Sequence, residues 1–164
     1  MQLRRARGFA LLEALLAMAL FASAGLAALW SLQHTAQQQR QQLLQSTAML
    51  LAQDLSERMF VNAHQTALYA RTWQSQTPIS ASDCTQQLCT ASALAAWDLQ
   101  QWLDLVRKQL PQGDAQIQPM PRFVNAWSVT LAWKDERTQP INDEALPSCP
   151  AGLRCWQLVF SARL

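Results

Sequence analysis

The hydrophobic positions of the chain form one long unbroken run, followed by several periodic patterns. From Phe9 to Leu32 nearly every residue is apolar or small, and Glu13 is the only charged one. As an α-helix this run would span roughly 36 Å, more than the hydrocarbon core of a bilayer at about 30 Å. The run therefore predicts a membrane-spanning helix.

The run continues into a segment with the period of an amphipathic helix. Residues 33–61 contain no Pro or Gly and are rich in Gln, Leu, Ala and Arg, which favour helix. The other faces are polar and include Asp54 and Arg58 at i, i+4. We expect one helix from Phe9 to about Val61, with its second half packed on a globular head. Its apolar stripe comprises Leu44, Ala48, Leu51, Leu55 and Met59.

A second helix is predicted from Ala93 to Leu110. Thr90 or Ser92 is a suitable N-cap, and Pro111 and Gly113 end the helical pattern. The apolar face of this helix consists of Ala95, Leu99, Trp102, Val106 and Leu110.

Alternating apolar and polar positions predict two strands, Phe123–Trp133 and Trp156–Leu164. Such alternation is typical of a sheet with one face on a core. Ala115–Met120 is a weaker predicted strand, and we expect it at an edge of the sheet because Pro119 lacks a backbone N–H. We expect Lys134–Pro150 to be a connecting loop. The expected fold class is α+β, with a long N-terminal helix packed on a small antiparallel sheet and one extra helix.

Charge is concentrated ahead of the apolar run. Arg4, Arg5 and Arg7 precede it and hold that flank in the cytoplasm, so we expect the remainder of the chain outside. Without them the formal charge of +2 becomes slightly negative, which argues against nucleic acid as a general electrostatic partner. A DNA-binding surface remains an alternative, because several basic residues could converge in the fold: Arg107, Lys108, Arg122, Lys134, Arg137, Arg154 and Arg163.

All 4 cysteines lie in the C-terminal half. An even number beyond an export signal indicates two disulfides in an oxidising compartment. Three pairings are possible, and we favour Cys84–Cys89 with Cys149–Cys155 because both close short loops, each stabilising by about 2 kcal/mol. A zinc site would require a different spacing and usually a nearby His.

Glu13 distinguishes the apolar run from a simple signal sequence. A cleaved secretory signal needs a small-residue site after the run, whereas Ala22-Ser23-Ala24 lies inside it. A signal-anchor helix explains the length but not the acid, since a charge in a membrane helix is costly and needs a partner. We therefore interpret Glu13 as functional.

A family resemblance surrounds this acid. Residues 7–13 read RGFALLE and resemble the class III signal of type IV prepilins and type II secretion pseudopilins. The resemblance implies that prepilin peptidase cuts between Gly8 and Phe9 and methylates the new N-terminal amine of Phe9. It also implies that Glu13 pairs with the N-terminal amine of a neighbouring subunit, and opposite charges attract far more strongly in a low dielectric than in water.

A second resemblance is more particular. Residues 48–62 read AMLLAQDLSERMFVN and are similar to the A-x-x-LA-x-DL-x-ERM-x-x-N stretch of PilV-type minor pilins, also called type IV pilus modification proteins. Further matches to that pattern are Cys89, Ala96-Trp97-Asp98-Leu99, Trp102 and Leu110-Pro111-x-Gly113.

These resemblances imply a minor pilin that is incorporated into a type IV pilus or primes it. Its partners would be other minor and major pilins, prepilin peptidase and the inner membrane, which it spans once with the head in the periplasm before entering the fimbrium. A minor pseudopilin of type II secretion is the alternative. The implied organisation is a leader at 1–8, a transmembrane and assembly helix at 9–32, an amphipathic stem helix at 33–61 and a head at 62–164.

No catalytic constellation accompanies these signals. His34 and His64 stand apart from any recognisable motif, and Asp98 is interpreted as an exposed helical acid beside Trp102. We expect neither enzyme activity nor a cofactor. All but one of the 7 Trp residues lie in the head, where core filling is the expected role and a sticky assembly surface the alternative.

Overall fold

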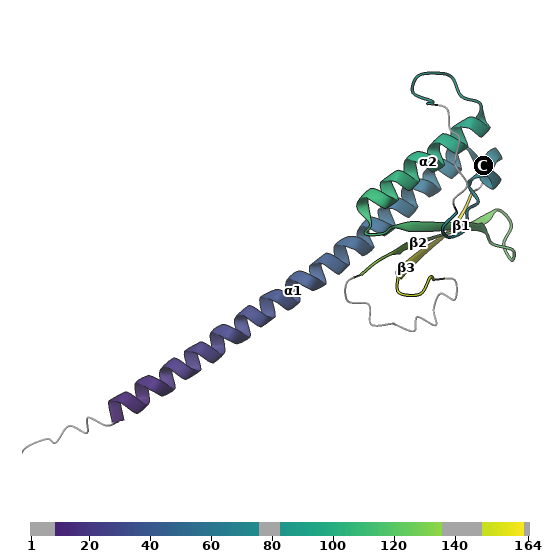
Figure 1. Ribbon diagram of the computed structural model, residues 1–164. Coiled ribbons are helices and arrows are strands. Elements are labelled where there is room, and N and C mark those ends of the chain that lie inside the picture. The colour runs from purple at the N-terminus through teal and green to yellow at the C-terminus, as the bar shows by residue number, and fades with distance from the viewer. Residues whose placement is uncertain (1–8, 76–82, 136–148, 163–164) are drawn as a thin grey trace, which may run out of the picture. The chain divides into compact units, whose positions relative to one another are not determined.

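The computed structural model describes residues 9–75, 83–135 and 149–162. It confirms the α+β class: a long N-terminal helix, further helices and a small antiparallel sheet (Figure 1). The elements in chain order are α1 (Phe9–Val61), the 3₁₀ helix η1 (Ala63–Tyr69), α2 (Ala91–Gln109), β1 (Asp114–Pro119), β2 (Ala126–Trp133) and β3 (Arg154–Ser161).

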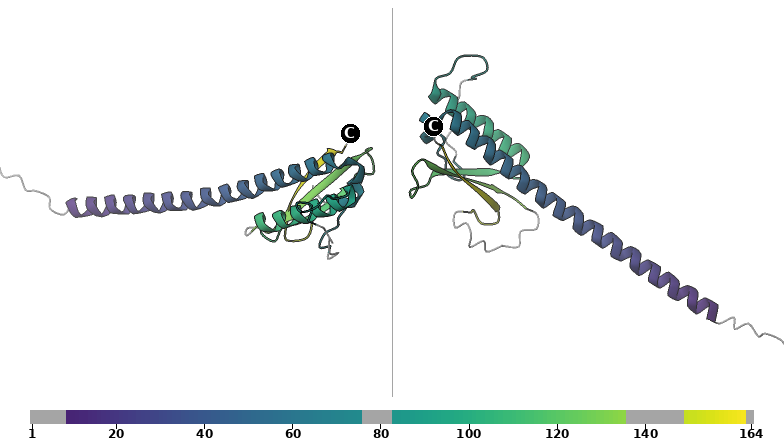
Figure 2. Two further views of the ribbon diagram at one scale, coloured as in Figure 1. Left: turned by 90° about the horizontal axis from the view of Figure 1, so that it is seen from above. Right: turned by 180° about the vertical axis from the view of Figure 1, so that it is seen from behind.

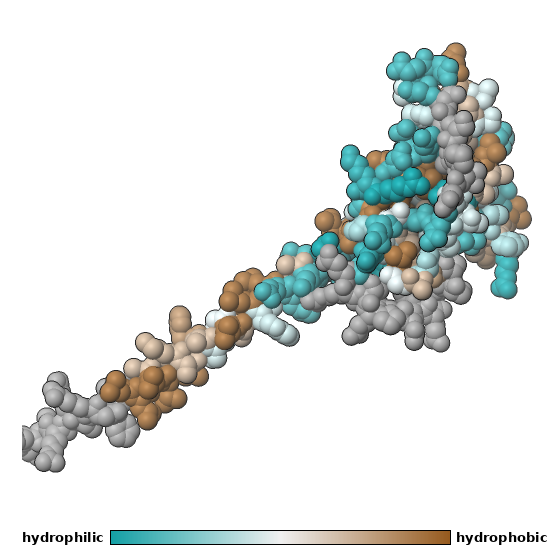
Figure 3. Space-filling view, viewed as in Figure 1, coloured by the Kyte–Doolittle hydropathy of each residue, from teal (hydrophilic) through white to brown (hydrophobic). Residues whose placement is uncertain are grey.

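The chain divides into two compact units, Met1–Gln42 and Leu43–Leu164, and α1 contributes residues to both. In the first unit, the large apolar side chains from Leu11 to Leu32 are exposed on the helix, whose N-terminal part is mostly brown and tan in Figure 3. The helix contains a segment of mean hydropathy 2.0 that is long and apolar enough to cross a membrane. None of that segment is buried within the protein.

The second unit contains one hydrophobic core. The predicted stripe of α1 is buried there from Ala48 to Met59, and Leu44 packs against it half-buried. The predicted apolar face of α2 is also buried there, and the two helices lie side by side (Figure 2). The sheet contributes the side chains of one face to the same core. The largest fully buried side chains of the core are those of Trp102, Tyr69, Leu55, Met59, Leu110, Ile117 and Leu131.

Local contacts define both ends of α2. The Thr90 side chain accepts a hydrogen bond from the Ala93 amide at 3.2 Å, so Thr90 is the N-cap and the helix begins two residues before its predicted start. At the other end, the Gly113 amide donates to the Leu110 carbonyl at 2.9 Å. A Cβ at Gly113 would lie 2.6 Å from the Val106 carbonyl oxygen, so only glycine fits this reversal.

The strands lie in the order β1-β2-β3, with both pairs antiparallel. The prediction that β1 is an edge strand is confirmed. Ile117 exchanges two backbone hydrogen bonds of 2.8 Å with Arg71 on the side of β1 that faces away from β2. By the alternation of an antiparallel ladder, Pro119 shares this outer orientation, so its missing N–H is not needed by the sheet.

The predicted bounds of the other strands need correction. β2 begins at Ala126, because Asn125 adopts φ 57° and interrupts the extended backbone; Phe123 and Val124 are exposed in the preceding turn. β2 is also buried along both faces, so the expectation of one buried face is wrong for this central strand. β3 begins two residues earlier than predicted, at Arg154, while Arg163 and Leu164 lie outside the described residues.

Candidate functional site

Glu13 lies in the second turn of α1 and is exposed among apolar side chains. Within the described residues it forms no hydrogen bond or ion pair, so its carboxylate is available to a group from another molecule. Phe9 is the first residue of the helix. Gly8 lies outside the described residues, so the cleavage position between Gly8 and Phe9 stays a prediction.

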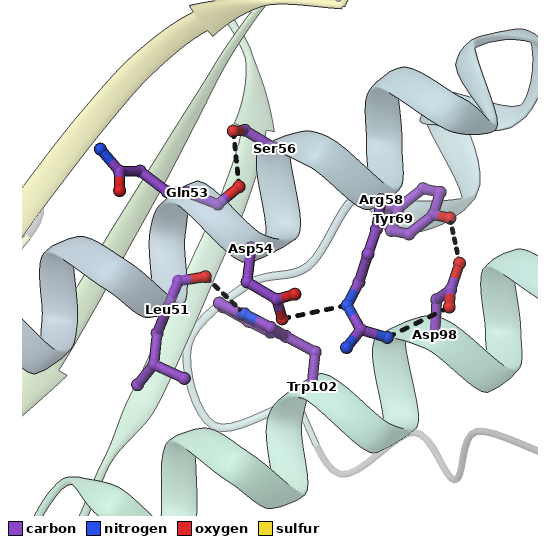
Figure 4. Close-up of polar contacts among 8 residues, drawn as sticks. All are labelled: Leu51, Gln53, Asp54, Ser56, Arg58, Tyr69, Asp98 and Trp102. Carbon is purple, nitrogen blue, oxygen red and sulfur yellow. Dashed lines mark hydrogen bonds and ion pairs between the residues drawn. The ribbon is translucent and has the colours of Figure 1, made fainter.

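A polar network joins three elements of the second unit (Figure 4). Arg58 of α1 donates from Nε to Asp54 at 3.0 Å and from Nη1 to Oδ1 of Asp98 on α2 at 3.2 Å. The other carboxylate oxygen of Asp98 accepts the hydroxyl of Tyr69, from η1, at 3.0 Å. Arg58 thus lies between two carboxylates, and Asp98 connects α2 to both α1 and η1.

The network changes the acidity of Tyr69. Burial is the largest cause and raises its pKa to about 12, and the negative charge of Asp98 acts in the same direction. The side chain of Asn62 and the charge of Arg58 oppose this shift in part. The phenol is therefore held in its neutral form, in which it donates to Asp98.

Two further hydrogen bonds join α1 to α2. The side-chain amide of Asn62, directly after α1, donates to the Ala91 carbonyl in the first turn of α2 at 2.8 Å. The indole N–H of Trp102 donates to the Leu51 carbonyl of α1 at 2.7 Å. Both donors are buried or nearly so, which makes each bond costly to lose.

Asp98 corrects the sequence-based interpretation. It was expected to be an exposed acid, but it is 8% exposed and fully engaged by Arg58 and Tyr69. The i, i+4 spacing of Asp54 and Arg58 predicted their ion pair, whereas nothing in the local pattern indicated the reach to α2. One available signal was the nearly continuous apolar face around Asp98, because an acid adjoining such a face needs a partner.

All four cysteines form disulfides, Cys84–Cys89 and Cys149–Cys155, with Cα–Cα distances of 5.5 and 5.9 Å. These are the pairs that the short loops favoured. No thiolate remains for the alternative zinc site. The first disulfide lies directly before the N-cap of α2, and the second closes the turn that leads into β3.

The candidate basic residues do not form one free cluster within the described ranges. Arg107 pairs with Asp104 and Arg154 with Asp135, each at 3.5 Å. Arg122 precedes β2 and Lys134 follows it, so they lie at opposite ends of that strand. Arg137 and Arg163 lie outside the part of the chain that the structure describes.

A long N-terminal helix, further helices and a small antiparallel sheet form a pilin-like α+β arrangement, which supports a type IV pilin-like protein. Residues 31–100 match a family described as Tt1218-like, type IV pilin Tt1218. All residues of the polar network, from Asp54 to Asp98, lie within the matched segment. Comparisons with curated proteins and with solved structures gave no match.

The pilin family is structural, which is consistent with a protein that is not an enzyme. Its members assemble with other pilins in a pilus, and the apolar helix of this chain fits a membrane-anchored pilin.

Proposed function

We propose that the chain is a minor pilin of the PilV type, which is incorporated into a type IV pilus or primes it. Prepilin peptidase removes residues 1–8 by cutting between Gly8 and Phe9, and Phe9 is N-methylated. Residues 9–32 hold the subunit in the inner membrane before assembly, and residues 62–164 form a periplasmic head on the stem of residues 33–61.

The observation that carries this proposal is the type IV pilin match in a chain whose helix exposes Glu13, which has no partner among the described residues, on an apolar surface. Cleavage before Phe9 would create an amine four residues from this acid along the same helix. Within one subunit the two groups would lie about 6 Å apart along the axis. A neighbouring helix shifted by about one turn would bring its amine level with Glu13. Their attraction is strong where water is excluded, so this contact would select correctly staggered helices.

The test compares Glu13→Gln, Gly8→Ala and the unchanged chain in a piliated host. Gly8→Ala should leave the leader attached, which intact-mass measurement of the membrane-extracted protein detects. Glu13→Gln should be cleaved and methylated normally but be depleted at least about tenfold from the sheared fibre fraction, equivalent to about 1.4 kcal/mol. Ser23→Ala, on the same helix, is the matched control and should enter fibres normally.

Equal incorporation of all these variants would refute the proposal. A pseudopilin of type II secretion would show the same processing defects. In that case loss of the chain would abolish export of secreted enzymes and leave piliation unchanged, so both phenotypes are measured in the same strain.

A further inference from the structure

The two edges of the sheet differ in their protection. The outer edge of β1 is occupied at its centre by Arg71 and carries Pro119, two features that block the addition of another strand. The outer edge of β3 has neither Lys nor Pro, and no described residue pairs with its backbone. Natural proteins normally protect such edges, so among the described residues the edge of β3 is the one open to an added strand.

The register identifies which groups of β3 are free. The Ala162 amide donates to the Asn125 carbonyl at 3.0 Å, which places the backbone of Ala162 toward β2. By alternation, the N–H and C=O groups of Gln157, Val159 and Ser161 point away from β2. They present the hydrogen-bonding pattern that an added extended strand requires.

An apolar hollow adjoins this open edge. Phe123 is 62% exposed, Val124 78% and Val159 50%, and all three line the hollow between the β1–β2 turn and the end of β3. Hydrogen bonds of the turn hold it in place: the Phe123 amide donates to Met120 at 3.1 Å, and the Phe123 carbonyl accepts from Ala126 at 3.4 Å. The exposure of these side chains therefore belongs to a hydrogen-bonded structure.

The positively charged side chain of Arg122 is part of the hollow. Arg122 is exposed and forms no hydrogen bond or ion pair within the described chain. It is thus available to a carboxylate of whatever occupies the hollow. The free edge, the apolar surface and the cation together specify an extended peptide with an apolar side chain beside an Asp or Glu.

We propose that an extended segment of a different pilin subunit adds to β3 as a fourth strand, inserts an apolar side chain between Val124 and Val159, and pairs an acid with Arg122. This inference rests on the proposed pilin function. The recognition is of the β-augmentation kind, in which backbone hydrogen bonds supply affinity and side-chain pockets supply specificity.

The experiment uses the full-length chain in its piliated host, with a photoreactive phenylalanine analogue at position 124. Irradiation should link the analogue to another pilin subunit. Mass spectrometry should identify the linked peptide, and its sequence should have the alternating pattern of a strand and contain Asp or Glu. The same analogue at Gln101, exposed on α2, is the positional control and should give no such adduct.

Second-site variants then test the chemistry. Val159→Pro removes an outward N–H and also changes a side chain that lines the hollow, so it should reduce the adduct at least about three- to tenfold, the value of one hydrogen bond. Val159→Thr keeps that N–H and its β-branched shape and should retain more adduct than Val159→Pro. Arg122→Glu alters an exposed side chain without touching the fold, so its effect is independent of stability, and it should also reduce the adduct severalfold.

Adducts only with lipid or a second copy of this chain would overturn the inference, as would equal yields from Arg122→Glu and the unchanged chain. Such a result in a strain whose fibre fraction still contains the chain refutes the fourth strand and leaves the pilin proposal intact. If the chain never enters the fibre fraction, the pilin proposal itself fails.

Discussion

Arg58 and Asp98 lie 40 positions apart in the sequence, yet Nη1 of Arg58 is 3.2 Å from Oδ1 of Asp98. This contact connects the stretch of α1 that resembles PilV-type pilins with the second stretch of resemblance, on α2. The two stretches are therefore two halves of one polar network.

Asp98→Asn should lower the free energy of unfolding by about 2 kcal/mol, because it leaves Arg58 with one carboxylate and weakens the acceptor of Tyr69. Denaturant unfolding of the detergent-solubilised chain measures this change. Asp104→Asn is the matched control: its ion pair with Arg107 is exposed on the same helix and should be worth less than about 0.5 kcal/mol. A similar loss in both variants would show that Asp98 contributes no more than a surface charge.

Tyr69 should titrate far above an ordinary tyrosine. It is the only Tyr of the chain, so tyrosinate absorbance follows it alone. The folded protein should show a midpoint near its pKa of about 12, against 10.0 for a free tyrosine. A midpoint near 10 in protein that is still folded would contradict the burial of the phenol.

The same shift links stability to alkaline pH. The folded pKa is raised, so the stabilisation by the neutral phenol is fully present below about pH 10 and is lost as pH rises through about 12, at up to about 1.4 kcal/mol per unit. Tyr69→Phe should remove this component of the pH dependence. Comparing denaturation midpoints of the two proteins across that interval measures it.

Gly113→Ala should destabilise the second unit by about 1–3 kcal/mol, because the new methyl would overlap the Val106 carbonyl oxygen and Leu110. Thermal unfolding of the second unit reports the loss. Gly25→Ala is the control, since nothing lies within 4 Å of the position of its Cβ. An unchanged transition for Gly113→Ala would mean that the turn after α2 adopts another conformation.

Asn62→Asp should cost about 1–3 kcal/mol, because it replaces the N–H donor to Ala91 with a carboxylate that faces a carbonyl oxygen. The comparison is His64→Asp, which adds an acid at an exposed position of η1 and should have little effect. Chemical denaturation distinguishes the two, and equal losses would assign the effect to negative charge alone.

Periodicity predicted the helices well and the ends of the strands less well. The stripe of α1 and the face of α2 were identified correctly because each is a local repeat of the helix itself. The start of β2 was misplaced because Asn125 adopts positive φ, a conformation that hydrophobic alternation does not report. The prediction of an exposed Asp98 is wrong because the groups that bind its buried carboxylate come from α1 and η1, far away in the sequence.

The contribution of α1 to the core has a consequence for biogenesis. The stripe from Leu44 to Met59 is synthesised early, whereas the strands that complete the same core come last. Until β3 has been synthesised, the sheet that completes the core around this stripe is not formed. Contacts between segments so distant in sequence also form slowly. A nascent subunit should therefore be most vulnerable to proteolysis and aggregation just before its synthesis ends. A chaperone that covers the stripe would act in that interval.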